Sequence, residues 1–162
     1  MRALIWITED TWQACVDQAR LYLPADAEVT LLHVAPADVE QVAAGGARGL
    51  LGRRPPPPPG PPLRAIAEHE AQALLRAARE RLKRPATLTA RRGRVEHEVV
   101  AACAAGDLLI AARDGDLRAG PKSLGPRARF VVDHAPCQVL LVWAGRPAVD
   151  SAKAHPLSSR HQ

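Results

Sequence analysis

Five apolar runs of strand length recur along the chain, and they predict five β-strands. Consecutive apolar residues are typical of a strand that is buried on both faces, as strands of a parallel sheet are. The third run is the least apolar and is therefore expected at an edge of the sheet. The predicted strands cover residues 3–8, 28–34, 86–90, 107–112 and 137–143.

The segments between these runs carry apolar residues at steps of three and four, which is the pattern of an amphipathic helix. Asp10 or Thr11 can cap the first helix, and Pro24 ends it. A second proline, Pro136, separates the last helix from the last strand. The predicted helices cover residues 12–23, 63–84, 95–103 and a stretch that ends near residue 134.

Strands and helices alternate, and this order indicates an α/β fold with a doubly wound parallel sheet. Right-handed crossovers place the first strand at the centre of that sheet. Ligands of such sheets bind beyond the carboxyl ends of the strands, where the winding changes direction. The predicted crevice therefore lies between residues 8–10 and 112–125.

The 162 residues are enough for one domain, which we assign to residues 1–144. Residues 35–62 are a Pro/Gly-rich loop insertion, because polyproline fits neither a helix interior nor a sheet. This insertion is a spacer or, alternatively, a ligand for a proline-binding partner. Residues 145–162 lack periodicity and are expected to form a polar, flexible tail.

Composition narrows the list of partners. The net charge is +5, but the basic residues are scattered and only 3% of the chain is aromatic. A base-stacking platform is therefore not expected, and we predict no nucleic-acid partner. The three cysteines lack metal-binding spacing and predict reduced, buried thiols in a cytoplasmic protein. No apolar run reaches the roughly 20 residues of a membrane span.

The last strand carries a recognisable sequence. His134-Ala-Pro-Cys137-Gln-Val-Leu-Leu-Val142 resembles the His-Ala-Pro-Cys-Pro-Val-Leu-Val-Val ending of the universal stress protein family. The strands Thr30–Val34 and 107–110 are also similar to the family. The resemblance implies an adenine nucleotide α-hydrolase-like fold with strand order 3-2-1-4-5. It also implies a homodimer formed through strand 139–143.

Nucleotide-binding members of that family carry the motif Gly-x2-Gly-x9-Gly-Ser/Thr, in which a glycine loop and a helix N-terminus hold phosphates. The same register here has Ala112 and Gly115, then Gly125 followed by Pro126. The family's acidic residue after the first strand is Thr8. The resemblance implies a crevice for ATP or another adenine nucleotide, with Mg²⁺, and makes these residues, together with Val34 and Arg127, the candidate cofactor-binding set.

Several polar side chains in and near this loop have two interpretations. Arg113, Lys122, Arg127 and Arg129 can replace part of a lost phosphate site, or they are ordinary surface charge. Ser123 offers a hydroxyl. Asp114 and Asp116 can hold Mg²⁺ beside a nucleotide, or they belong to a polar Asp-Gly turn, which we favour.

No metal or catalytic site is predicted. The histidines have no metal-ligand spacing, and we expect His134 to cap the last helix and His33 to be a satisfied strand histidine. No nucleophile, base and oxyanion site come together, so we expect no enzyme. The sequence supports a regulatory stress-response protein with a nucleotide crevice or, alternatively, an interaction module of the same fold that has lost its nucleotide.

Overall fold

The computed structural model describes residues 1–37, 61–116 and 118–144. The insertion predicted at 35–62 therefore lies mostly outside the described residues, and the tail predicted at 145–162 lies entirely outside them. Within the described ranges, no helix is long and apolar enough to cross a membrane.

All five strands pair in parallel in one sheet, in the order β3-β2-β1-β4-β5. The predicted fold class and strand order are confirmed. The third predicted strand is indeed at one edge, and the last strand is at the other. The strands are β1 Arg2–Trp6, β2 Glu28–Pro36, β3 Thr87–Gly93, β4 Leu108–Arg113 and β5 Gln138–Trp143.

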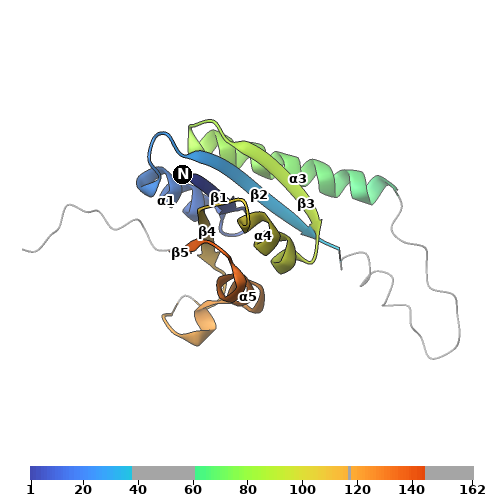
Figure 1. Ribbon diagram of the computed structural model, residues 1–162. Helices are drawn as coiled ribbons and strands as arrows, with labels where there is room; N and C mark the ends of the chain where they lie inside the picture. The colour runs from blue at the N-terminus through green and yellow to red at the C-terminus, as the bar shows by residue number, and fades with distance from the viewer. Residues whose placement is uncertain (38–60, 117, 145–162) are drawn as a thin grey trace, which may run out of the picture.

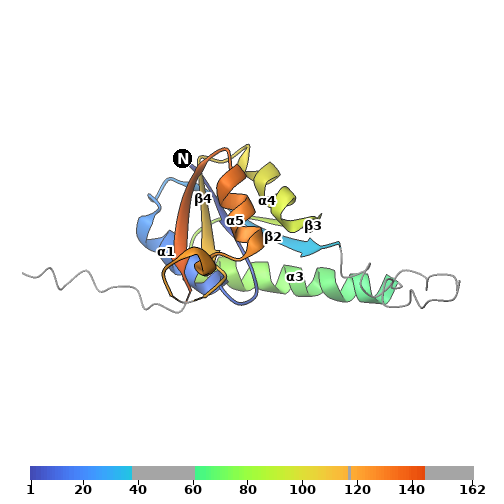
Figure 2. The same cartoon turned by 90° about the horizontal axis from the view of Figure 1, so that it is seen from below.

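Helices cover both faces of this sheet, as Figure 2 shows from below. One face carries α1 and α3, and the other carries α4 and α5, which is the result of right-handed crossovers on both sides of β1 (Figure 1). The α-helices are α1 Trp12–Tyr22, α3 Pro61–Leu82, α4 Val95–Cys103 and α5 Pro126–His134, and a short 3-10 helix, η1, spans Pro121–Ser123.

Two apolar clusters fill the spaces between the layers. Ile5 and Ile7 point into the cluster beneath α1 and α3, whereas Leu4 and Trp6 point into the cluster beneath α4 and α5. Because successive side chains of a strand alternate between faces, one continuous apolar run serves both clusters. Each fully buried aliphatic side chain contributes roughly 1.5–3 kcal/mol.

Several element boundaries differ from the prediction by one to three residues, and two of these differences have a clear physical reason. Helix α3 begins at Pro61 instead of residue 63, since proline lacks only an amide that the first turn leaves unpaired anyway. Strand β3 continues past residue 90 to Gly93, although Arg91 and Arg92 are not apolar. It continues because β2 also runs on to Pro36, which pairs with Gly93.

Candidate functional site

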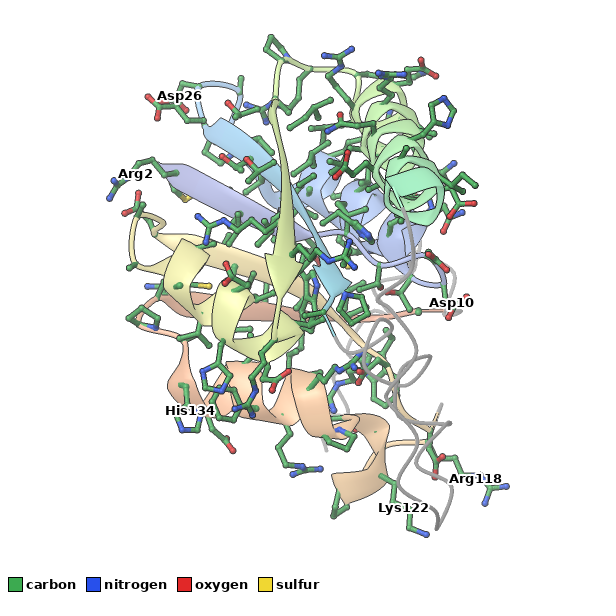
Figure 3. The ribbon with its side chains drawn as sticks, turned by 90° about the vertical axis from the view of Figure 1, so that its right-hand side faces the viewer. Arg2, Asp10, Asp26, Arg118, Lys122 and His134 are labelled. Carbon is green, nitrogen blue, oxygen red and sulfur yellow. The ribbon has the colours of Figure 1, made fainter. Side chains whose placement is uncertain are left out.

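The carboxyl ends of β1 and β4 meet at one edge of the molecule, as predicted for the crevice. The two strands are neighbours, with Ile5 opposite Ile110. Figure 3 shows Asp10, Arg118 and Lys122 on this side, and Arg2 and Asp26 at the opposite end of the strands. The segment between β4 and α5, here called the β4–α5 loop (residues 114–125), therefore lies where doubly wound sheets bind ligands.

Thr8 follows β1, and both its hydroxyl and its carbonyl bind residues at the start of α1. Its hydroxyl lies 2.6 Å from the hydroxyl of Thr11, and its carbonyl accepts the amide of Trp12 at 3.1 Å. Thr11 is the residue before α1, but its side chain makes no capping bond to the helix. The Thr11 hydroxyl pairs with Thr8 instead.

Val34 and Ala112 contribute to the core. Val34 is 5% exposed in the cluster beneath α4 and α5, and Ala112 is 7% exposed in the cluster on the opposite face. The structure thus brings both residues to the carboxyl edge of the sheet but points their side chains away from each other.

Gly115 allows the β4–α5 loop to fold back on itself. Its amide donates to the carbonyl of Ser123 at 3.2 Å, and the amide of Asp116 donates to the carbonyl of Lys122 at 2.8 Å. A Cβ atom at Gly115 would lie 2.1 Å from the Lys122 carbonyl oxygen. Glycine is therefore required at this position for the close approach of two backbone segments.

Ser123 is fully buried and already paired. Its hydroxyl donates to the carbonyl of Gly120 at 2.7 Å and accepts a short hydrogen bond from the Arg113 guanidinium. The guanidinium also lies over the ring of Trp143, 4.7 Å from its centroid. Two groups that the sequence offers for anion binding therefore bind each other.

Asp114 lies at the N-terminus of α5. Its Oδ1 accepts the amide of Gly125, the residue that caps the helix, at 2.6 Å. A Cβ atom at Gly125 would be 2.9 and 3.0 Å from the two carboxylate oxygens, so the carboxylate lies directly against this glycine. The next residue, Pro126, is the first of the helix and has no amide hydrogen to donate.

The remaining cations of this region differ in their surroundings. Arg127 and Lys122 are exposed. Arg129 donates to the carbonyl oxygens of Pro121 and Leu124, which fastens η1 to α5. Arg129 is therefore a structural residue of the loop.

These residues do not fit a nucleotide phosphate at the start of α5. The Gly125 amide already binds the Asp114 carboxylate, and Pro126 has no amide hydrogen to donate. The Ser123 hydroxyl is buried and donates to the Gly120 carbonyl. A phosphate placed there would meet the Asp114 carboxylate, and two uncompensated negative charges repel each other. Within the described ranges, no group of three or more acidic, histidine or cysteine side chains could hold a metal ion.

The sequence did not single out the Asp114–Gly125 contact. It marked Asp114 only as a turn residue or a magnesium ligand. The two residues are eleven positions apart, and their contact depends on how the loop closes. The one available signal is an acid located where a parallel strand ends and a helix N-terminus follows.

The histidine predictions hold for both residues tested. His134 Nδ1 lies 2.8 Å from the carbonyl of Phe130 in the last turn of α5, so it caps that helix end. His33 Nδ1 lies 3.0 Å from the carbonyl of Ile7. The ring of Phe130 is stacked on His134 at 4.0 Å and also contacts His97 of α4 at 4.9 Å, which ties the two helices together.

A hollow on the α4 side of the sheet lies at the other end of the strands from the β4–α5 loop. It has a volume of about 280 Å³, and Thr30, Thr89 and Arg91 are among the residues that line it. Arg91 contacts Glu98 of α4 there at 3.4 Å. None of the residues that line this hollow belongs to the predicted crevice at 8–10 and 112–125.

The sheet order, the two helical layers and the position of the β4–α5 loop together define the adenine nucleotide α-hydrolase-like fold, and this is the fold of the universal stress proteins. No protein-family model and no curated protein matches the sequence.

The chain is, however, similar in structure to several solved proteins. The chain is similar to hypothetical protein MJ0577, with a TM-score of 0.66, 16% identity, and coverage of 90% of this chain and 97% of that one. It is similar to a universal stress protein in complex with cAMP, with a TM-score of 0.59, 13% identity, and coverage of 89% and 97%. For the universal stress protein UspA from Lactobacillus plantarum the TM-score is 0.54 at 17% identity, with coverage of 88% and 97%.

Proposed function

We propose that this chain is a divergent universal stress protein, regulatory and without catalytic activity, that acts in the cytoplasm as an interaction module independent of adenine nucleotides. The observation that carries this proposal is the Asp114 carboxylate on the Gly125 amide at 2.6 Å. It supports a β4–α5 loop that is complete without a phosphate.

Calorimetry on the full chain tests the nucleotide part of this proposal. ATP, ADP, AMP and cAMP are titrated with and without Mg²⁺, and purified protein is checked for nucleotide released by acid. We expect no heat of binding at millimolar ligand and no released nucleotide. Saturable binding in the micromolar range, or a nucleotide carried through purification, would falsify the proposal.

Adenine-nucleotide binding is the second candidate. It is favoured by one specific observation, which is that a protein of the same fold is in complex with cAMP. The predicted crevice, beyond the carboxyl ends of β1 and β4, is where such a ligand would bind. The same titration separates the two candidates.

Self-association through β5 is the second part of the proposal. Strand β5 is an edge of the sheet, and its apolar residues Val139, Leu140 and Leu141 are only half-buried in the single chain. An apolar edge strand offers unpaired backbone groups to another chain. We therefore propose a homodimer formed by edge-to-edge contact of β5.

A proline at a position whose amide faces outward blocks such pairing. The amide of Gln138 points to the carbonyl of Asp107 on the β4 side, so the amide of Val139 points to the open edge. We expect Val139→Pro to be monomeric, and Val139→Ala, which keeps the amide, to have twice the 17.4 kDa chain mass in light scattering. A folded Val139→Pro protein that remains dimeric contradicts this interface.

A further inference from the structure

We infer that the Asp114 carboxylate is a built-in anion, which occupies the N-terminus of α5 and excludes phosphate groups from it. This inference rests on the proposed function, because it names the residue that makes the loop independent of a nucleotide. Asp114 thereby keeps other anions away from the N-terminus of α5, and this N-terminus would bind an anion if the Asp114 side chain were removed.

The geometry of the contact is that of an anion on a helix N-terminus. A carboxylate bound to a backbone amide at a helix cap is among the stronger hydrogen bonds in proteins. The 2.6 Å distance from Oδ1 to the Gly125 amide is short, and both carboxylate oxygens lie within 3.0 Å of the point that a Cβ atom of residue 125 would occupy. The amides of Arg127 and Ala128 in the first turn have no acceptor within the helix.

The carboxylate is held in place by its neighbours on both sides. Arg113 precedes it and is fixed by Ser123 and by the Trp143 ring. Gly115 follows it and is fixed by the Ser123 carbonyl. The Asp114 backbone is thus fastened at both ends, which reduces the entropy lost when its side chain binds the helix.

The surrounding charge would attract an anion if Asp114 were absent. Residues 113–129 contain five arginines and lysines and two aspartates. Asp114 therefore offsets an excess of positive charge at a helix start that already favours anions. Removing the whole Asp114 side chain raises the net charge of this segment from +3 to +4 and frees the Gly125 amide.

The test compares four forms of the full chain: wild type, Asp114→Ala, Asp114→Asn and Asp116→Ala. Asp114→Asn removes the charge but keeps an acceptor for the Gly125 amide. Asp116→Ala is the matched control, because it removes the same charge one residue beyond Gly115 without touching Gly125. AMP and inorganic pyrophosphate are the probes, titrated by calorimetry and by the nitrogen–proton NMR signal of Gly125.

We expect Asp114→Ala to bind pyrophosphate and AMP at least about tenfold more tightly than wild type, as the release of one charge-assisted amide predicts. The NMR signal of Gly125 should shift on titration in this variant only. Asp114→Asn should show a smaller gain in affinity, and the affinity of Asp116→Ala should match that of wild type. Circular dichroism confirms that each variant is folded.

The inference is overturned if neither Asp114 variant gains affinity, or if Asp116→Ala gains as much as Asp114→Ala. These outcomes are independent of the proposed function. The affinity of wild type for nucleotides tests the proposed function, whereas the ratio of variant to wild-type affinity tests the role of Asp114.

Discussion

The Arg113 guanidinium donates a hydrogen bond to the hydroxyl of Ser123, a side chain with no exposed surface. Arg113 ends β4, and Ser123 ends η1, so this bond closes the β4–α5 loop against the sheet. The loop therefore has a small polar interior of its own, in which no buried side-chain polar atom of the described residues lacks a partner.

Ser123→Ala should loosen this loop. The substitution removes the hydroxyl that binds the Arg113 guanidinium and one of the two hydrogen bonds to the Gly120 carbonyl, which keeps the Ser123 amide as a donor. The loss of these two bonds costs about 1–3 kcal/mol of unfolding free energy. Chemical denaturation measures the loss, and amide exchange should speed up at Gly115 and Asp116.

Arg113→Met is the companion variant, since it removes the same bond from the other side. Because the two variants remove one shared interaction, their effects should be less than additive when combined. Full additivity would mean that the Arg113–Ser123 bond contributes nothing to stability.

Gly115→Ala should also open the loop, for a steric reason. The new methyl group would lie 2.1 Å from the Lys122 carbonyl, so the backbone must separate, at a cost of about 1–3 kcal/mol. Gly106→Ala is the control, because a Cβ there meets its nearest atom at an ordinary 3.6 Å. Thermal unfolding should show a loss for Gly115→Ala and little change for Gly106→Ala.

Asp107 should make the protein sensitive to acid. The Arg2 amide, 2.7 Å from Oδ2, and the Arg2 side chain hold the pKa of Asp107 below its usual value near 3.8. A carboxyl with a lowered pKa in the folded state stabilises the fold above its unfolded pKa, and this stability is lost as the pH falls through the folded value.

In Asp107→Asn the free energy of unfolding should therefore decrease less steeply with falling pH below about pH 4. Its dependence on pH near neutrality should be the same as in wild type. Urea denaturation at a series of pH values measures the difference. An identical acid-side slope in both proteins would show that the Arg2–Asp107 contact does not contribute to acid stability.

The three cysteines should differ in reactivity. Burial raises the pKa of Cys15 to about 12, and burial together with the adjacent Cys137 raises the pKa of Cys103 to about 12. Thiolates are the reactive form, so neither buried thiol should react near neutral pH. Cys137 is half-buried and should be alkylated first.

Mass spectrometry after brief treatment with iodoacetamide should find one label on the native protein, at Cys137. All three positions should be labelled in denaturant. Labelling of Cys15 at a comparable rate in the native state would contradict the burial described for α1.

The sequence predicts the sheet well because the sheet depends on local composition. Continuous apolar runs such as 107–112 have no polar face to expose, so they must lie between two helical layers. The end of β3 was not predictable in this way, since Arg91 and Arg92 join the sheet through the register with β2. Pairing with a neighbouring strand overrides a weak local pattern.

The site was less predictable, because its contacts, like the end of β3, depend on residues that are distant in the sequence. The spacing of Ala112, Gly115 and Gly125 indicated where a loop of this kind lies. It did not show that Asp114 reaches Gly125, or that Ser123 turns inward to Arg113. Both contacts depend on chain closure over about ten residues, for which no local pattern exists.

The position of the anion within the chain has a consequence for how this protein responds to its surroundings. A dissolved ligand orders a loop only when its concentration exceeds its dissociation constant. The Asp114 carboxylate is tethered eleven residues from the Gly125 amide, so its local concentration is fixed by the chain itself. We therefore expect the shape of the β4–α5 loop to be independent of nucleotide concentration, so that a partner that recognises it would meet the same surface whether nucleotide is scarce or abundant.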